Sequence, residues 1–351
     1  MTLDVVARHA GVSLATASRA LNGTTRVRDE LRERVRAAAD LLGYIPNAHA
    51  QALASSSSNT VGLICHDVGD PYFAAIAGGV MRAAAQQDVL VMLASTFREP
   101  AREIEYVSIL RAQRARAILL IGSGFQDRTW ERALSAELDP YIRAGGRVAV
   151  VSRHRSVRAD AVLPENRAGA AALARALLAL GHRRFAVLSG PPELTTVADR
   201  LAGFREGLAE AGITLDRDCV VEGAFTRDGG YAAARELLAR RRARPTCVFG
   251  VTDVMAVGAL AAFREAGIDV PADISLAGFD DIPLVRELTP PLTTVALPLT
   301  EMGQHAISLA LREPHGQRSR VLRVGGEVVV RASTGPPPPD GTTNNVTGEG
   351  I

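Results

Sequence analysis

The segment TLDVVARHAGVSLATASRALNG, at residues 2–23, predicts two short helices joined by a tight turn. Thr2 and Ser13 each precede an apolar-periodic stretch and can cap a helix, because a side-chain oxygen there accepts a backbone N–H of the first turn. Gly11 lies between the two stretches and permits the turn. The expected helices cover residues 3–9 and 14–21.

A third helix is expected over residues 29–42, where Leu31, Val35 and Leu42 fall on one face and Gly43 ends the helix. Two short helices around a glycine turn, with a third that buries their apolar faces, form the helix-turn-helix plan. The sequence therefore predicts a DNA-binding domain over residues 1–46.

The next stretch predicts a hinge over residues 47–58. Its first part, NAHAQALA, favours a helix but is too short to hold one alone in water, and the four serines at 55–58 form a flexible linker. We expect this helix to form only beside a partner.

Residues 59–334 alternate short apolar stretches with amphipathic ones, as in Val61–Cys65 followed by Phe73–Gln87. This βαβ pattern of a parallel sheet occurs twice. The predicted fold class is α/β, with two Rossmann-like, doubly wound parallel-sheet subdomains after the helix-turn-helix domain. Because ligands bind at the carboxyl ends of such strands, the two halves predict a cleft. The polar, proline-rich residues 335–351 predict a disordered tail.

The composition speaks against an enzyme. The sequence contains no lysine, which excludes the P-loop lysine and the Schiff-base lysine, and it has neither HExxH nor GxSxG. Asp280 and Asp281 are adjacent, so their side chains diverge rather than act as an acid–base pair. The net charge of +2 means that any affinity for nucleic acid must be local.

The cysteine spacing gives no indication of a metal or cofactor site, and the apolar stretches give none of a membrane segment. Cys65, Cys219 and Cys247 are far apart and lack metal-ligand spacing, so we expect reduced, buried thiols, with no metal and no cofactor. No stretch is long and apolar enough to span a bilayer, and no signal peptide is recognised. We expect a cytoplasmic protein without a membrane partner.

Several motifs together resemble the lactose-repressor (LacI/GalR) family. They run from residue 2 to 334: LDVVA, AGVS and TASRALNG near the start, LGYIPNA at 42–48, DPYF at 70–73, LGHRR at 180–184, RLAGF at 200–204, DISLAGFDD at 273–281 and PLTTV at 291–295. The resemblance implies a transcription regulator with a core similar to periplasmic sugar-binding proteins. It places the first lobe at about 59–162 and 293–322, and the second at about 163–292 and 323–334.

The resemblance also implies how DNA is read. In a helix-turn-helix the N-terminal side chains of the second helix meet base edges in the major groove. Arg19 can donate two hydrogen bonds to a guanine. Leu14 and Ala15 can select only by apolar contact, whereas the family usually has a polar residue at one of these positions. The alternatives are a solvated Arg19 and a Leu14 packed in the core. The remaining candidates are Thr16 beside the bases, and Ser13 and Thr2 at phosphates.

The family's hinge helix lies in the minor groove, where a leucine wedges between base steps. Leu53 matches this residue, with Asn47 and Ala50 alongside; the alternative is that Leu53 packs on the core. Two hinge helices side by side imply a homodimer on a near-palindromic double-stranded operator.

The effector of such a regulator is implied to bind between the lobes. Arg200 and Asp280 are expected to face each other across the cleft and to bind vicinal hydroxyls; the alternatives are an arginine in a structural salt bridge and an aspartate that caps a loop. Tyr72 and Phe73 are expected to stack on the ligand, or else to be core aromatics. The complete set of candidates is Pro71, Tyr72, Phe73, Ser152, Arg153, Arg200, Phe225, Thr252, Asp253 and Asp280.

The ligand class is left with alternatives. Ser152, followed by Arg153, stands where many family members have aspartate, which would suit an anionic ligand as well as a neutral sugar. We expect a repressor controlled by a sugar or a sugar derivative. The alternatives are a regulator with a nucleoside or purine corepressor, and a small-molecule binding protein without a regulatory role.

Overall fold

The computed structural model describes residues 2–22, 27–44, 59–154, 157–240, 244–312 and 319–339. The predicted hinge residues Asn47, Ala50 and Leu53 lie outside these ranges, as does the chain after residue 339. No helix in the described ranges is long and apolar enough to cross a membrane.

The N-terminal domain consists of three helices, α1 (Leu3–His9), α2 (Leu14–Asn22) and α3 (Asp29–Leu41), around an apolar cluster of their own. Ser13 caps α2, because its hydroxyl accepts the Thr16 amide at 3.1 Å. The predicted side-chain cap by Thr2 is wrong: its backbone carbonyl, not its hydroxyl, accepts the amides of the first turn of α1. Gly11 has a φ of +63°, as the predicted turn requires.

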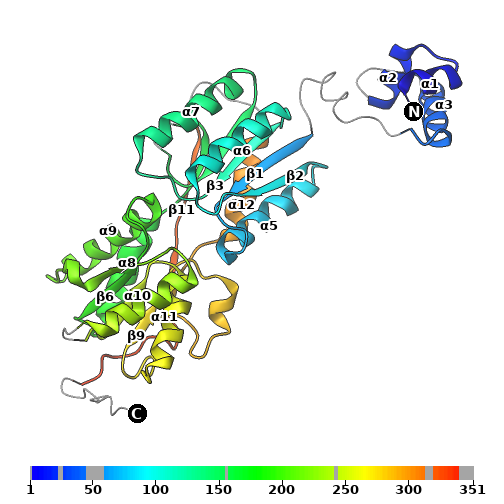
Figure 1. Ribbon diagram of the computed structural model, residues 1–351. Helices are drawn as coiled ribbons and strands as arrows, with labels where there is room; N and C mark the ends of the chain where they lie inside the picture. Colours follow the sequence, from blue (N-terminus) through cyan, green and yellow to red (C-terminus); the bar gives the residue numbers. More distant parts are fainter. Residues whose placement is uncertain are drawn as a thin grey trace, which may run out of the picture.

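The first lobe of the core contains a six-stranded sheet in the order β11-β5-β4-β3-β1-β2. Its pairings are all parallel. Its central strands are buried except for the first residue of β1 and of β4, which explains their nearly continuous apolar sequence. Helices α5 and α12 pack against each other on one face, and α6 and α7 on the other (Figure 1). The elements are β1 (Thr60–Cys65), α5 (Pro71–Ala85), β2 (Leu90–Ser95), α6 (Pro100–Ala112), β3 (Ala117–Ile121), α7 (Arg128–Arg143), β4 (Arg147–Val151), β5 (Asp160–Pro164), α12 (Leu299–Leu311) and β11 (Val321–Val324).

The second lobe contains a four-stranded parallel sheet in the order β7-β6-β8-β9. Its helices form two packed pairs, α8 with α9 and α10 with α11. The elements are α8 (Asn166–Ala179), β6 (Phe185–Ser189), α9 (Thr195–Ala209), η1 (Arg217–Cys219), β7 (Val220–Glu222), α10 (Arg227–Ala239), β8 (Cys247–Gly250), α11 (Asp253–Glu265), β9 (Ser275–Ala277) and η2 (Pro283–Arg286). The predicted α/β class with two parallel-sheet lobes is confirmed.

The return of the chain to the first lobe occurs later than expected. Strand β10 (Thr294–Ala296) pairs with β12 (Glu327–Val329), and bridges from Ala277 and Asp280 hold β10 beside the second lobe's sheet. Residues 293–298 therefore extend the second lobe, and the first lobe resumes at α12.

Two further expectations are corrected. The start of the predicted disordered tail is held in place, because the Gly335 carbonyl accepts His182 Nε2 at 2.9 Å and the Gly335 amide donates to Ser275 Oγ. Cys65 and Cys247 are buried, but Cys219, in a surface 3₁₀ turn, is only half-buried.

Candidate functional site

The N-terminal end of α2 presents the predicted base-reading side chains to solvent. Ala17 and Ala20 lie on the opposite face of the helix and pack in the apolar cluster. Leu14 is 50% exposed, so the alternative of core packing is wrong, and Ala15 and Arg19 are exposed as well. The Thr16 hydroxyl bonds with that of Ser13 at 2.8 Å, which holds both polar groups at the start of the helix. The contacts of these residues with DNA remain a prediction.

The candidate effector site is a cavity enclosed by both lobes. It lies where the strands of each sheet end, the position at which open α/β sheets bind ligands. Its volume of about 20 Å³ is far below the 300–1,000 Å³ or so of ordinary ligand pockets, so the lobes are closed on an almost filled centre. The lining residues are Asp70, Tyr72, Phe73, Gly122, Ser123, Ser152, Pro164, Thr196, Arg200, Phe225, Thr252 and Asp280.

Arg200 and Asp280 form a buried, two-pronged ion pair in this cavity. Arg200 Nη2 donates to Asp280 Oδ1 at 2.6 Å and Nη1 to Oδ2 at 3.2 Å, while the remaining donors reach Asn166 and the Val251 carbonyl. The guanidinium also lies 3.9 Å from the centre of the Phe279 ring. The expectation that the two side chains face each other across the cleft is wrong, because α9 and the end of β9 both belong to the second lobe.

The backbone at Asp280 adopts an unusual conformation. Asp280 has a φ of +120° and Asp281 a φ of +55°, a region that L-residues rarely enter unless their surroundings hold them there. The Asp280 amide donates to the Val295 carbonyl at 2.9 Å, which provides this restraint. Burial raises the pKa of the Asp280 carboxyl to about 6, although the ion pair with Arg200 acts in the opposite direction.

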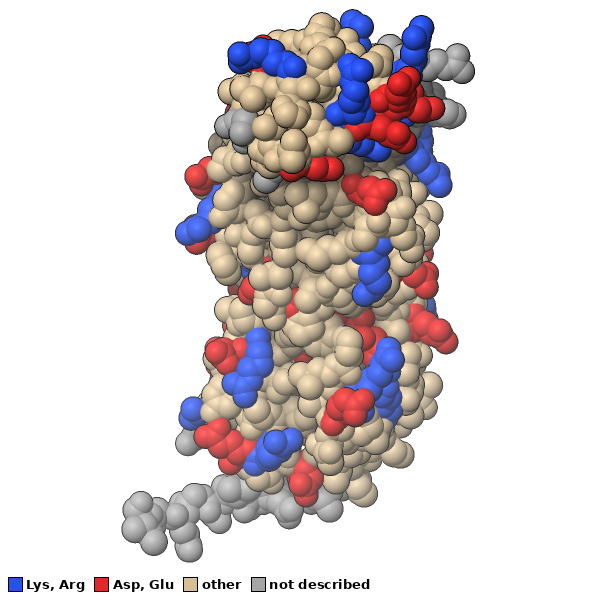
Figure 2. Space-filling model, turned by 90° about the vertical axis from the view of Figure 1, so that its right-hand side faces the viewer, with Lys and Arg blue, Asp and Glu red and all other residues tan. Residues whose placement is uncertain are grey.

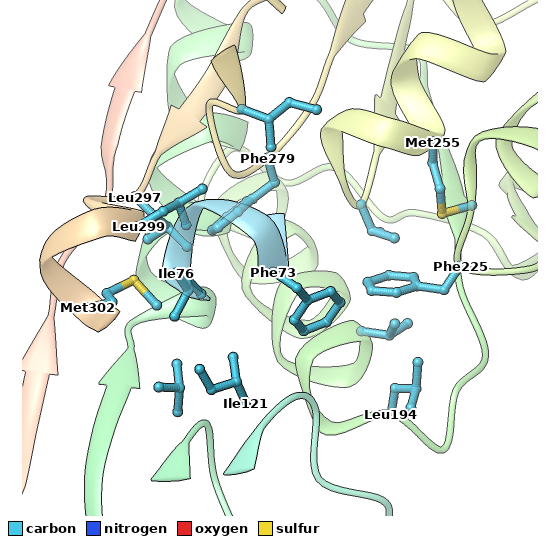
Figure 3. Close-up of a cluster of buried hydrophobic side chains, with 14 of the residues drawn as sticks. Phe73, Ile76, Ile121, Leu194, Phe225, Met255, Phe279, Leu297, Leu299 and Met302 are labelled. Carbon is cyan, nitrogen blue, oxygen red and sulfur yellow. The ribbon is translucent and has the colours of Figure 1, made fainter. Parts of the chain in front are cut away.

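Each lobe contributes an aromatic ring to the cavity. The Asp70 carboxylate caps α5 by accepting the Tyr72 amide at 3.0 Å, which positions Tyr72 and Phe73 at the first turn. Figure 3 shows Phe73 of the first lobe beside Phe225 of the second, and both side chains are buried. A planar or ring-shaped ligand that entered here would meet an aromatic face from either lobe.

Three predicted effector residues do not line this cavity. Arg153 pairs instead with Asp199 at 2.6 Å, beside a neighbouring cavity of about 480 Å³. The buried Asp253 carboxylate accepts the Thr294 hydroxyl at 2.6 Å and the Ile282 amide at 2.9 Å, so it joins chain segments of the second lobe. Pro71 is the first residue of α5 and faces a third cavity.

Five lining residues were not among those predicted from the sequence, namely Asp70, Gly122, Ser123, Pro164 and Thr196. Thr196 precedes Arg200 by four positions on α9, so helical periodicity places it on the same face. Gly122 and Ser123 directly follow β3, and their place at a strand end could have identified them. Thr252, which was predicted, also caps α11 by accepting the Met255 amide.

Comparison with known proteins gives two family matches. The profile of the bacterial regulatory proteins of the lacI family matches residues 2–47, and that of the periplasmic binding protein-like domain matches residues 174–334. The transcriptional regulator DegA of Bacillus subtilis is 32% identical over 338 residues, which cover 95% of this chain and 98% of DegA.

Two solved structures of transcription regulators resemble this chain over nearly its whole length. The lac repressor dimer bound to operator and the anti-inducer ONPF superimposes with a TM-score of 0.81 at 28% identity, covering 95% of this chain and 99% of that one. The complex of the transcriptional regulator CelR with cellobiose gives a TM-score of 0.67 at 30% identity, with the same coverage of both chains.

Proposed function

The chain belongs to the lacI family of bacterial regulatory proteins, and from this we propose that a carbohydrate bound between its lobes controls repression at an operator. The observation that carries the proposal is the buried Arg200–Asp280 pair in the lining of the interlobe cavity. A guanidinium and a carboxylate side by side can donate to and accept from neighbouring hydroxyls of one sugar ring.

The other walls of the cavity favour a neutral ligand. Ser123, Ser152 and Thr196 offer hydroxyls, and Phe73 and Phe225 offer apolar faces to the ring. Arg153, the cation that would have favoured an anionic ligand, is paired with Asp199 outside the cavity. We therefore favour a neutral sugar. Because two phenyl rings can also enclose a flat base, a purine or nucleoside is the second candidate.

Entry of the ligand requires the lobes to move. A cavity of about 20 Å³ holds little more than a water molecule, so a sugar binds only when the lobes separate or rearrange. The ligand then shifts the population between two lobe arrangements by its difference in affinity for them. We infer that the cavity binds rather than transforms its ligand, because Arg200 and Asp280 neutralise each other and neither is free to act as a general acid or base.

We further propose that the chain is a homodimer that joins through the outer edge of the first lobe's sheet. Strand β2 is an edge strand, yet it exposes Leu90, Met92 and Leu93. Met81 is exposed on the neighbouring α5. Figure 2 shows this side of the molecule, and the band at the height of α5 and β2 is largely uncharged. An apolar edge of this kind is normally covered by a partner. A two-fold dimer would present two copies of α2 to a near-palindromic operator.

Selection of duplexes from a random library by the full chain tests the proposal. We expect recovery of a near-palindrome and salt-dependent binding to it in fluorescence anisotropy. The titration is repeated with cellobiose, ribose, a sugar phosphate and a purine nucleoside. A change in operator affinity with a neutral sugar supports the proposal. A change only with the sugar phosphate or only with the nucleoside would show that the ligand is of that class and not a neutral sugar. Failure to select any DNA sequence overturns the proposal.

A further inference from the structure

A cavity of about 540 Å³ lies at the amino ends of the strands of the second lobe's sheet. Its lining includes Phe185, the first residue of β6, and residues that lie just before the other three strands: Cys219 before β7, Pro245 before β8 and Ile274 before β9. The effector cavity lies at the carboxyl ends, so the length of the parallel sheet separates the two (Figure 1). A volume of this size is within the range of about 300–1,000 Å³ that is usual for ligand pockets.

The wall of this cavity toward the core is apolar. Phe185, Leu215, Leu237, Ile268 and Ile274 line it, and all five side chains are buried. A hydrocarbon group placed against such a wall leaves water for an apolar surface, which is favourable. The hydroxyls of a sugar would find few partners there and would lose their hydrogen bonds to water. The cavity therefore favours a ligand with an apolar body.

Most charged side chains in the lining are engaged within the protein. The Asp273 carboxylate accepts a backbone amide at 2.8 Å, and Asp216 and Asp218 each have a partner as well. Arg240 pairs with Glu236 at 2.6 Å. These charges are used in the fold and are not held ready for a ligand.

Arg244 is the exception. Its guanidinium has no hydrogen-bond or ion-pair partner among the residues that the structure describes, and it lies exposed at the edge of the cavity. Its backbone is held in place, because Arg184 Nε donates to the Arg244 carbonyl at 3.3 Å. A guanidinium with free donors binds a carboxylate through charge-assisted hydrogen bonds. The edge of the cavity thus offers a cation above an apolar wall.

We propose that this cavity binds an apolar carboxylic acid, with its hydrocarbon part against Phe185 and Leu237 and its carboxylate at Arg244. The site is a second ligand site, separate from the carbohydrate cavity, and it does not rest on the proposed function. Unlike the effector cavity of about 20 Å³, it has room for a ligand without movement of the lobes.

Cys219 provides the first test, because it lines the cavity and is half-buried, whereas Cys65 and Cys247 are buried. The full chain is alkylated with iodoacetamide, and the rate at each cysteine is followed by peptide mass spectrometry. At an octanoate concentration about ten times its dissociation constant from calorimetry, alkylation of Cys219 should slow about tenfold, since only the unliganded protein reacts. The neutral 1-octanol should protect much less at the same concentration. An unchanged rate with octanoate, or equal protection by 1-octanol, would overturn the proposal.

Variants at the edge of the cavity provide the second test, by calorimetric titration with octanoate. Arg244→Gln should weaken binding about threefold to fivefold, as expected for an exposed ion pair. Arg205→Gln is the matched control, because Arg205 is exposed on α9 and lies outside the cavity. Ala239→Phe adds a ring at the exposed last residue of α10 and should abolish binding, whereas Ala232→Phe, exposed on the same helix but outside the lining, should not. Binding unaffected by Arg244→Gln or Ala239→Phe would overturn the site. Because neither DNA nor carbohydrate is present, such a failure is distinct from a failure of the proposed function.

The chain after residue 339 is the competing occupant. The Gly335 amide donates to Ser275 Oγ, and Ser275 directly follows Ile274 of the cavity lining, so the chain passes close by. A variant that ends at Pro339 should bind octanoate with the same affinity as the full chain. Tighter binding by the shortened chain would show that residues 340–351 occupy the cavity, and would overturn its assignment to a separate ligand.

Discussion

Arg200 and Asp280 lie 80 residues apart in the chain, and their side chains, which are 2% and 4% exposed, form a bidentate ion pair. The pair joins α9 to the segment after β9 and lies entirely in the second lobe. The second lobe therefore supplies a preformed polar group, and closure of the first lobe adds Tyr72 and Phe73 above it. Stability and ligand recognition depend on the same two side chains.

Removal of one partner should destabilise the protein strongly. Arg200→Met leaves Asp280 buried without a counter-charge, and we expect the free energy of unfolding in urea to fall by about 3–5 kcal/mol. Arg200→Met/Asp280→Leu should recover a large part of this loss, because an apolar pair leaves no unpaired charge. A double variant less stable than the single one would contradict the assignment. Arg286→Ala, which removes a largely exposed partner of Asp281, should cost far less.

Buried His66 predicts a dependence of stability on pH. It packs between Phe73 and Phe125, and burial, followed by the nearby charge of Arg98, lowers its pKa from 6.5 to about 3. A lowered histidine pKa contributes stability above pH 6.5 that is lost as the pH falls toward the folded-state value.

His66→Gln removes this contribution, so the free energy of unfolding of the wild type and of this variant should depend differently on pH. Between pH 6.5 and pH 5 the wild type should lose about 2 kcal/mol relative to the variant in urea unfolding. His9→Gln, at an exposed position on α1, is the control, and its free energy of unfolding should change between these pH values by the same amount as that of the wild type. Parallel curves for the wild type and His66→Gln would contradict the prediction.

Arg19 should determine operator specificity. Arg19→Ala is expected to reduce affinity for the selected operator by about 1–3 kcal/mol in anisotropy titrations, with a much smaller effect on random duplex. Arg8→Ala, on α1 and paired with Asp4, is a control that removes an equal charge from the same domain. A similar loss on both kinds of DNA would indicate that Arg19 binds phosphate rather than a base.

The exposed edge strand should carry the dimer. Met92→Lys places a charge on the apolar face of β2, and we expect a shift toward monomer in sedimentation equilibrium because a buried charge without a partner is unfavourable. Val330→Lys, at an exposed apolar position after β12, should leave the mass unchanged. A dimer unaffected by Met92→Lys would place the interface elsewhere.

The sequence predicted those helices and strands whose apolar pattern lies within a single segment of the chain. Helix α1 has the predicted bounds, because apolar periodicity and burial act within one segment. The strands β10 and β12 were missed, since each has only three residues and depends on pairing with a segment about 30 positions away. The return to the first lobe was misplaced for the same reason.

The sequence predicted which residues line the cavity better than it predicted how their side chains are oriented and paired. The family resemblance indicated Ser152, Thr252 and Asp280, which follow strands and line the cavity. The direction of a side chain is not encoded at such positions: Asp253, adjacent to Thr252, turns away to accept the Ile282 amide. The pairing of Arg200 with Asp280 depends on how α9 packs, which no local pattern reveals.

The most direct test of ligand control compares the wild type with Arg200→Lys on the selected operator, with and without the compound that the titration identifies. Lysine retains the charge opposite Asp280 but lacks the planar fork that donates to a carboxylate and a hydroxyl together. We predict that the ligand changes operator affinity of the wild type at least tenfold, and that Arg200→Lys binds the operator normally but shows little response. An equal response of both proteins would contradict the assignment of the Arg200–Asp280 cavity as the effector site.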